Sequence, residues 1–157
     1  MTLYAKDIMV TEFDKVHEHA PAGEAIHKIL NGKVRKSGYK SASLLVVNEG
    51  GHLAGVVTIF DVLYHLRPDF LNYGISGEEV PWQGHLKVFV QKLGEKRVEH
   101  IMSRNLVFAS PDEHIMVLLD RMVKNRYRRL PIANDGRPVG IIYLEDIYYH
   151  LFKDQGK

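Results

Sequence analysis

Cysteine is absent from the 157 residues of this chain. Its absence excludes disulfides, thiolate zinc sites, iron–sulfur clusters and cysteine nucleophiles. Long apolar runs are absent as well. A membrane-spanning helix needs about 18 apolar residues in a row, and no run approaches that length. Residues 1–10 lack the apolar core of a signal peptide and already carry Lys6 and Asp7. We therefore expect a soluble, cytoplasmic protein that does not enter the membrane.

An excess of one charge is also missing. Lys and Arg number 21 and Asp and Glu number 19, which gives a formal net charge of +2. A dedicated nucleic-acid-binding domain is usually far more basic, so a nucleic-acid interface would have to be a local patch. The chain does contain 45% hydrophobic and 25% charged residues, the composition of an ordinary globular protein. At this length a chain buries roughly 70% of its unfolded surface and needs no metal or disulfide to fold.

The chain contains an internal repeat. Ile8-Met9 recurs as Ile101-Met102, 93 residues later. An apolar helical stripe at i, i+3, i+4, i+7 and i+8 recurs at the same offset; its members are Ala22, Ala25, Ile26, Ile29 and Leu30, then Ile115, Leu118, Leu119, Met122 and Val123. Later landmarks are offset by only 85 or 86, so the first copy holds about seven extra residues around Asn31–Ser41. An insertion confined to a loop is typical of a duplication.

Each copy predicts the same order of elements, β-α-β-β-α. A short extended segment and the amphipathic helix come first, and two strands joined by a hairpin turn and a final helix follow. The predicted strands and final helices are Ser43–Val47, Leu53–Val57 and Ile59–Leu66, then Arg129–Ala133, Val139–Ile142 and Leu144–Phe152. In the second copy Ser110-Pro111-Asp112-Glu113 fits a capping box with proline at the first helical position, so the amphipathic helix is expected to start there.

The ordered landmarks resemble those of a pair of cystathionine-β-synthase (CBS) domains. Each copy has an Ile-Met near its start and a Gly-h-h-x-x-x-Asp junction, with h hydrophobic, between its last strand and last helix. The junctions are Gly55-Val56-Val57-Thr58-Ile59-Phe60-Asp61 and Gly140-Ile141-Ile142-Tyr143-Leu144-Glu145-Asp146. The resemblance implies an α+β fold, a tandem repeat of two β-α-β-β-α CBS units packed sheet to sheet with pseudo-twofold symmetry.

The same resemblance implies an organisation and a function. It divides the chain into CBS domain 1 (1–66), a linker with a short helix (67–97) and CBS domain 2 (98–157). The helix in the linker is predicted by the spacing of Leu86, Phe89, Val90 and Leu93. The resemblance further implies adenosine ligands in the clefts between the copies, regulation rather than catalysis, and dimers shaped like a flat disc.

Thr58 and Asp61 are the first candidate site. Thr58 ends a predicted strand and Asp61 lies in the first turn of the next helix, so the pair fits a helix cap. The same geometry fits a ligand, because a helix N-terminus attracts phosphate and a carboxylate accepts from both hydroxyls of a ribose. With the CBS resemblance the nucleotide interpretation is favoured, and it is compatible with the cap.

The second copy departs from this pattern. Tyr143 stands where the family has Ser or Thr, while Asp146 is retained. Tyr143 can fill the second cleft, stack on a base or pack in the core, and we favour filling or packing over stacking. A second nucleotide site at Asp146 is therefore the weaker prediction.

A basic run leads into the strand that begins at Arg129; its members are Lys124, Arg126, Arg128 and Arg129. Arg128 and Arg129 match positions where the CBS family carries phosphate-contacting residues, and their first-copy counterparts are the neutral Ala42 and Ser43. Arginine offers two-pronged contacts to phosphate. We expect Arg128 and Arg129 to bind phosphate and the rest of the run to be solvated. The same solvated role is expected for the basic residues of the insertion, Lys33, Arg35, Lys36 and Lys40.

Two further groups of residues are candidates for ligand contacts. Met9 and Met102 can flank an adenine ring, although methionine in such positions is more often core. His17-x-His19 invites a metal, but no carboxylate cluster or His-Glu-x-x-His motif accompanies it in sequence, so no metal or other cofactor is predicted. Nucleophile, Walker and dinucleotide-binding motifs do not occur, which ranks an enzyme last.

The leading hypothesis is thus a regulatory module that binds AMP, ADP or ATP between its copies through Thr58, Asp61, Arg128 and Arg129. The alternatives are a ligand-free dimer that docks a protein partner through 68–93, and a nucleic-acid-binding module. A homodimer is expected because the final helices carry more apolar residues than one buried stripe needs, namely Ile59, Val62, Leu63, Leu66, Ile147, Tyr148 and Leu151.

Overall fold

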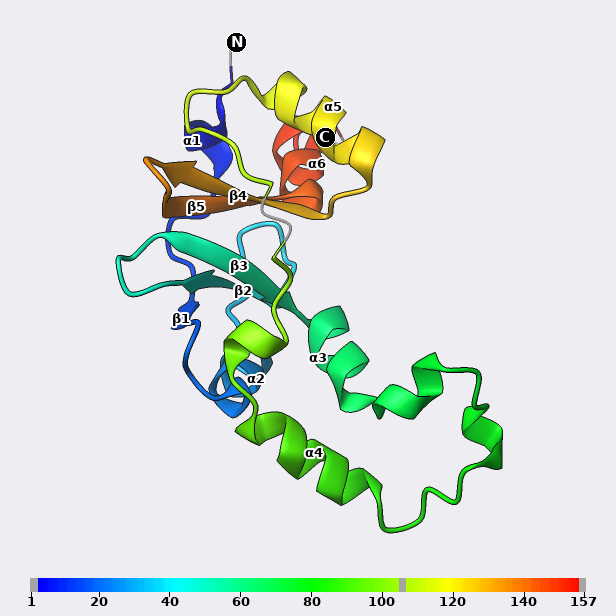
Figure 1. The fold of residues 1–157 in the computed structure, drawn as a ribbon. Helices are drawn as coiled ribbons and strands as arrows, with labels where there is room; N and C mark the ends of the chain where they lie inside the picture. Colours follow the sequence, from blue (N-terminus) through cyan, green and yellow to red (C-terminus); the bar gives the residue numbers. More distant parts are fainter. Residues whose placement is uncertain (1–2, 105–106, 156–157) are drawn as a thin grey trace.

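The computed structural model describes residues 3–104 and 107–155, which form two small sheets that face each other with helices on their outer sides (Figure 1). The first sheet has the order β1 (Lys15–His17), β2 (Ser43–Val47) and β3 (Leu53–Thr58). Strand β1 is parallel to β2, and β2 is antiparallel to β3. The second sheet is the antiparallel pair β4 (Arg129–Asn134) and β5 (Arg137–Tyr143).

Helices cover the outer face of each sheet. Those of the first copy and the linker are α2 (Ala22–Leu30), α3 (Ile59–Leu66) and α4 (Leu86–Glu95), and those on the second sheet are α1 (Ala5–Ile8), α5 (Ile115–Asn125) and α6 (Leu144–Phe152). Three short 3-10 turns lie at Asp69–Asn72, Gly77–Glu79 and Val98–His100. None of the helices in the described part of the chain has the length and apolar content needed to cross a membrane.

The α+β fold and its tandem repeat are confirmed. The predicted bounds of the final helices agree with α3 and α6, and each predicted strand is found with at most two added residues at either end. The hairpin glycines Gly51 and Gly136 both have φ of 78°, the left-handed region that glycine adopts without strain. The first strand of the second copy is reduced, within the described residues, to a single parallel bridge between Ala109 and Ile132.

The predicted start of the second amphipathic helix is wrong. Helix α5 begins at Ile115 rather than in the Ser110-Pro111-Asp112-Glu113 box. The Ser110 N–H does donate to the Glu113 carboxylate at 2.8 Å, but this bond closes a turn that precedes the helix. The chain then runs extended through His114, because the Ile115 N–H donates to the Leu3 carbonyl instead of forming a helix. A tertiary contact thus overrides the local capping signal.

The N-terminal segment of each copy packs on the other copy. Ala5 and Ile8 belong to the core under α5 and α6, and Ile101 and Met102 belong to the core under α2. Both cores are therefore completed by exchanged segments, which explains why helix α1 lies beside β5 in Figure 1. Neither copy buries its core alone, so the pair is expected to fold as one unit.

The glycine that opens each junction motif permits this exchange. A Cβ added at Gly55 would lie 2.7 Å from Met102 Sδ, and one added at Gly140 would lie 2.7 Å from Met9 Sδ. At Gly55 the added Cβ would also lie 2.8 Å from the Ser103 carbonyl oxygen, so a larger residue there would push the crossing segment away from the strand. At Gly140 the flexible Met9 side chain would have to move. In both copies the repeated glycine thus contacts the methionine of the Ile-Met segment that crosses over from the other copy.

The linker forms an arm that projects from the first copy (Figure 1). Its outer part is held by ring contacts: Phe70 stacks on Trp82 with ring centroids 6.2 Å apart, and Trp82 contacts Phe89 edge to face with centroids 6.0 Å apart. Helix α4 fixes the base of the arm, because Leu93 is buried in the first core. The predicted linker helix is confirmed, although its stripe residues Leu86 and Val90 are exposed.

Candidate functional site

The two strand–helix junctions lie at equivalent ends of the facing sheets. Register pairs Ser43 with Thr58 and Arg129 with Tyr143, so these four residues occupy matching positions at the ends of the strand pairs. The inner faces beyond them are apolar and include Leu45, Leu53, Ile141 and Tyr143. The candidate residues therefore gather at one end of an apolar interface between the copies.

The first junction is a closed cap around Asp61. The Thr58 N–H and hydroxyl donate to Asp61 Oδ2 at 2.9 and 3.0 Å, and the Asp61 N–H and Thr58 Oγ1 lie 3.2 Å apart. The Ser103 hydroxyl donates to Asp61 Oδ1 at 2.8 Å. Asp61 is 9% exposed, and all its partners are neutral. Ser103 follows the exchanged Ile101-Met102 segment, so this junction already joins both copies.

Arg129 lies close to this carboxylate. Burial lowers the pKa of Arg129 below its ordinary value, and the nearby negative groups, among them Glu145 and Asp61, oppose the shift. Two buried polar atoms lack a hydrogen-bond partner within the described residues, and they occupy equivalent positions of the copies: Ser43 Oγ and Arg129 Nε. Arg128, in contrast, is exposed. A half-buried guanidinium with a free N–H is suited to receive an anionic ligand.

The second junction holds its carboxylate in an ion pair. Arg35 Nε donates to Asp146 Oδ2 at 2.8 Å, and Arg35 Nη2 donates to Glu145 Oε1 at 3.1 Å. The Ser37 hydroxyl donates to the other oxygen of Asp146. The Arg35 side chain is only 5% exposed and the Asp146 side chain 8%. The partners come from the insertion of the first copy, which reaches over the second copy.

Tyr143 forms the floor beneath this ion pair. Its ring is buried at 4% exposure, and the guanidinium of Arg35 lies 3.5 Å from the ring centroid. The expectation that Tyr143 packs is therefore confirmed. The expectation that Arg35 is solvated surface is wrong, because a planar cation gains both a stacking surface and two carboxylates by folding inward. The same loop is anchored again where Lys40 Nζ donates to the Leu30 carbonyl at 2.6 Å.

Two cavities open beside the second junction. One of about 480 Å³ is lined by residues of the N-terminal segment, the insertion and α6, among them Met9, Lys36, Asp146 and His150. The other, of about 300 Å³, includes Ser43 and Tyr143 in its lining. Both volumes are in the usual range of small-molecule sites. Arg35 and Ser37 form part of the wall of the larger cavity.

The remaining candidates are not all brought to these clefts. Met102 is buried in the first core, whereas Met9 is half-buried and reaches a cavity wall. Ala42 lines a separate apolar groove of about 260 Å³ between α2 and α3. In the basic run, Lys124 pairs with Asp120 at 3.0 Å, as expected of a solvated residue. Arg126 ends α5 in a left-handed conformation with φ of 58°.

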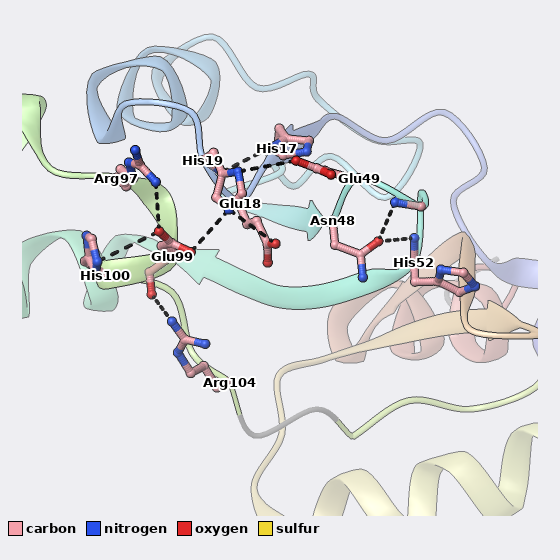
Figure 2. Close-up of polar contacts among 11 residues, drawn as sticks. His17, Glu18, His19, Asn48, Glu49, His52, Arg97, Glu99, His100 and Arg104 are labelled. Carbon is pink, nitrogen blue, oxygen red and sulfur yellow. Dashed lines mark hydrogen bonds and ion pairs between the residues drawn. The ribbon is translucent and has the colours of Figure 1, made fainter.

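His19 lies among three carboxylates (Figure 2). Its Nε2 is 3.7 Å from Glu18 Oε1 and 3.6 Å from Glu99 Oε2, and its Nδ1 is 3.9 Å from Glu49 Oε1. His17 Nδ1 accepts the His19 backbone N–H at 3.1 Å. The expectation that no carboxylate cluster accompanies these histidines is wrong, because folding brings Glu99 from the start of the second copy. With His19 protonated, these contacts are surface ion pairs, each worth about 0–1 kcal/mol.

Comparison with known proteins decides the family. The family model of the CBS domain matches residues 5–68 and 98–153. The chain belongs to the CBS domain family. Uncharacterized protein MJ1225 of Methanocaldococcus jannaschii is 25% identical to this CBS pair over 150 residues, which cover 95% of the chain and 43% of that protein. Zinc metalloprotease MJ0392 of the same organism is 26% identical over 153 residues, with coverage of 94% and 43%. The pair thus spans less than half the length of these two relatives.

Solved CBS structures share the fold. The CBS domain pair of protein MJ0100 in complex with 5-methylthioadenosine and S-adenosyl-L-methionine has a TM-score of 0.68 at 24% identity, and 99% of each chain is covered. CBSX2 in complex with AMP has a TM-score of 0.68 at 19% identity, with 97% of this chain and 98% of that chain covered. The CBS domain of a membrane protein from Sphaerobacter thermophilus has a TM-score of 0.71 at 23% identity, with 94% and 86% covered.

Proposed function

We propose that this CBS pair is a regulatory module that binds an adenosine nucleotide (AMP, ADP or ATP) at the first junction. Asp61 would accept hydrogen bonds from the ribose hydroxyls, and Thr58, at the N-terminus of α3, would donate to a phosphate. Arg128 and Arg129 would contact the phosphates from the second copy. The single observation that carries the proposal is the half-buried guanidinium of Arg129, whose Nε has no partner within the described residues and which lies in the field of Asp61.

The solved relatives support an adenosine group in the ligand. The CBSX2 complex contains AMP, and the MJ0100 complex contains 5-methylthioadenosine and S-adenosyl-L-methionine. These ligands share an adenosine moiety and differ in charge beyond the ribose. Arg128 and Arg129 would favour the anionic tail of a nucleotide over a cationic sulfonium. The proposal therefore names a nucleotide rather than S-adenosylmethionine.

The regulatory step follows from the exchanged segments. A ligand at the first junction would contact α3 of the first copy and Arg129 of the second, and Ser103 already connects the two at Asp61. Binding would therefore favour one relative orientation of the copies, a population shift that a partner protein can detect. No chemical step is assigned to these residues, in keeping with a regulatory rather than a catalytic module.

A second location is favoured by one observation, the cavities of about 300 and 480 Å³ beside the second junction. Lys33 lines both of them, and Lys36 lines the larger, so cationic groups are available there too. Against this location, both oxygens of Asp146 are already bonded to Arg35 and Ser37. The ribose-binding carboxylate would have to be released before a nucleotide could bind.

The proposal includes a homodimer formed through the final helices. Exposed apolar side chains on α3 and α6 are Ile59, Phe60, Leu63, Tyr64, Tyr148, Leu151 and Phe152. Ile147 was expected to contribute to this surface, but it is buried at 1% exposure in the second core. A sedimentation experiment at micromolar concentration should give a dimer, and monomer alone would contradict this part of the proposal.

The function is tested by thermal unfolding with AMP, ADP, ATP, GTP, NAD and S-adenosylmethionine. An adenosine nucleotide at 100 times its Kd should stabilise the protein by about 2.7 kcal/mol. Asp61→Asn is the matched variant, because the amide oxygen can still accept the Thr58 N–H while the negative charge is lost. Stabilisation of the wild type that is lost in the Asp61→Asn variant supports the site. No stabilisation by any nucleotide would favour a ligand-free interaction module, and salt-dependent retention on nucleic acid would favour the third hypothesis.

A further inference from the structure

The insertion of the first copy is a structured loop with a shape of its own. The Arg35 N–H donates to the Tyr39 carbonyl at 2.9 Å, and the Ser41 N–H donates to the Lys33 carbonyl at 3.0 Å. Gly38 turns the chain between them with φ of 92°. We name residues 33–41 the latch loop. Its backbone bonds show that the loop presents Arg35 and Ser37 from a defined hairpin rather than from an irregular tail.

The latch loop bonds to the second copy through one cluster. Arg35 spans Asp146 at 2.8 Å and Glu145 at 3.1 Å, while its Nη1 donates to Ser41 Oγ at 3.2 Å. Ser37 bonds to the remaining oxygen of Asp146. The guanidinium thus has two carboxylates, a hydroxyl and an aromatic face as partners. Because the Arg35 and Asp146 side chains are only 5% and 8% exposed, their ion pair is screened little by solvent and salt, whereas the Glu145 side chain is 34% exposed.

The two junction carboxylates therefore differ in how easily a ligand can use them. The partners of Asp61 are hydroxyls and an N–H, neutral groups that a ribose hydroxyl can replace or join. The principal partner of Asp146 is a cation, so Asp146 is held in a buried ion pair whose charge a neutral ribose hydroxyl cannot replace. The second copy is about seven residues shorter at the matching place, so it cannot place an equivalent loop over Asp61.

We propose that the latch loop is a built-in competitor of ligand at the second junction: Arg35 and Ser37 occupy both oxygens of Asp146 in the wall of the cavity, and only release of the loop frees this carboxylate for a ligand. The inference rests on the proposed function for the identity of the ligand, but not for the occupation of Asp146. A ligand that needs Asp146 binds only the released fraction of molecules, so its apparent Kd rises in inverse proportion to that fraction. The pair would then bind one nucleotide per chain, with a second site held in reserve.

Whether Arg35 holds the latch loop in place is tested without any nucleotide. The chain has no cysteine, so Ser43→Cys supplies a single thiol whose position is 8% exposed and lines a cavity beside the latch loop. Adding Arg35→Ala should raise its rate of maleimide labelling at least about tenfold. Lys36→Ala is the matched control, because it removes the same charge from the same loop without touching Asp146, and it should leave the rate unchanged. Arg35→Lys, which keeps the charge but not the fork, guards against misfolding and should give an intermediate rate.

The consequence for ligand is tested in an Asp61→Ala background, where the first junction is disabled. Equilibrium dialysis with ATP should show affinity rising at least about tenfold when Arg35→Ala is added, and Asp146→Ala should abolish that gain. An unchanged labelling rate in Arg35→Ala would overturn the latch, and so would faster labelling without any gain in ATP affinity when the wild type does bind ATP. If none of the proteins binds ATP, wild type included, the proposed function is contradicted, and the labelling rates alone then decide whether Arg35 holds the loop in place.

Discussion

The junctions at Asp61 and Asp146 are copies of one motif that the fold uses in opposite ways. Asp61 caps its helix through Thr58 and accepts one bond from the exchanged segment at Ser103. Asp146 has lost the capping hydroxyl to Tyr143 and has gained Arg35 as a counter-ion. A retained carboxylate therefore does not imply a retained role, because its partners decide whether a ligand can reach it.

The surroundings differ in charge as well as in partners. On the first side, a half-buried Arg129 lies near the carboxylate without forming a hydrogen bond at Nε to any described residue. On the second side, the corresponding strand begins with Ser43, and the nearby guanidinium of Arg35 is neutralised by Glu145 and Asp146. An anionic ligand therefore has an available arginine on one side only.

The largest expected effect comes from removing that cationic group. Replacing Arg128 and Arg129 with Ala should weaken ATP binding about a hundredfold or more, since each charge-assisted contact is worth roughly 1.5–3 kcal/mol and 1.4 kcal/mol is tenfold. Adenosine affinity should change less than about twofold, because its ribose still contacts Asp61. Isothermal calorimetry with both ligands measures the difference.

Lys124→Ala with Arg126→Ala is the control, because it removes two charges from the same basic run and should leave ATP affinity nearly unchanged. The preference of the wild type for ATP over adenosine should also shrink as salt rises. An equal loss of both ligands in the double arginine variant would instead show that Arg128 and Arg129 support the fold or the dimer.

The next largest effect is on the free energy of unfolding. Here Asp146→Ala should cost more than Asp61→Ala, the reverse of their order for ATP binding. Asp146→Ala leaves the buried Arg35 without its nearest carboxylate, with Glu145, Ser41 and the Tyr143 ring as remaining partners, and we expect it to cost about 2 kcal/mol of unfolding free energy. Asp61→Ala removes a helix-capping interaction and should cost about 1 kcal/mol. Urea unfolding measures both. If Arg35→Ala added to Asp146→Ala caused a further full loss, the two residues would not be acting as a pair.

The smallest effect is a pH dependence shared by the two copies. Burial lowers the pKa of His65 and of His150, and nearby lysines, Lys96 and Lys153, lower it further. The unfolded chain therefore takes up protons first, so stability is fully present above pH about 6.5 and falls as the pH drops through that value. Unfolding curves between pH about 7.5 and about 5.5 should show this decline, and it should flatten in the His65→Gln, His150→Gln protein. A decline unchanged in that protein would assign it to other groups.

Most of the fold could be predicted because its signals are local. Short apolar runs beside the hairpin turns indicated β2 and β3, and helical spacing indicated both final helices. The hairpin glycines adopt the positive φ that the turns require. The start of α5 could not be predicted this way. Its capping signal is real, yet the backbone next to His114 bonds to the N-terminal segment, at Leu3, which is far away in sequence.

The candidate site was only partly accessible from sequence for the same reason. The capping geometry of Thr58 and Asp61 and the buried position of Tyr143 follow from their place in the motif. The partner of Asp146 did not, because Arg35 lies 111 residues away in a loop that resembles solvated surface. One signal was present: the insertion is the main length difference between the copies, and a loop unique to one copy is free to acquire a contact of its own.

The central claim, that the first junction binds the nucleotide and the second does not, is tested most directly by calorimetry of ATP with Asp61→Ala and Asp146→Ala side by side. The account predicts at least about a tenfold loss of affinity for Asp61→Ala and less than about twofold for Asp146→Ala, with one ATP per chain in the wild type. Asp61→Asn, which keeps an acceptor for the cap, should lose affinity like Asp61→Ala. Equal losses for the two aspartates would contradict the account by implicating both junctions, and a larger loss for Asp146→Ala would place the nucleotide at the second junction.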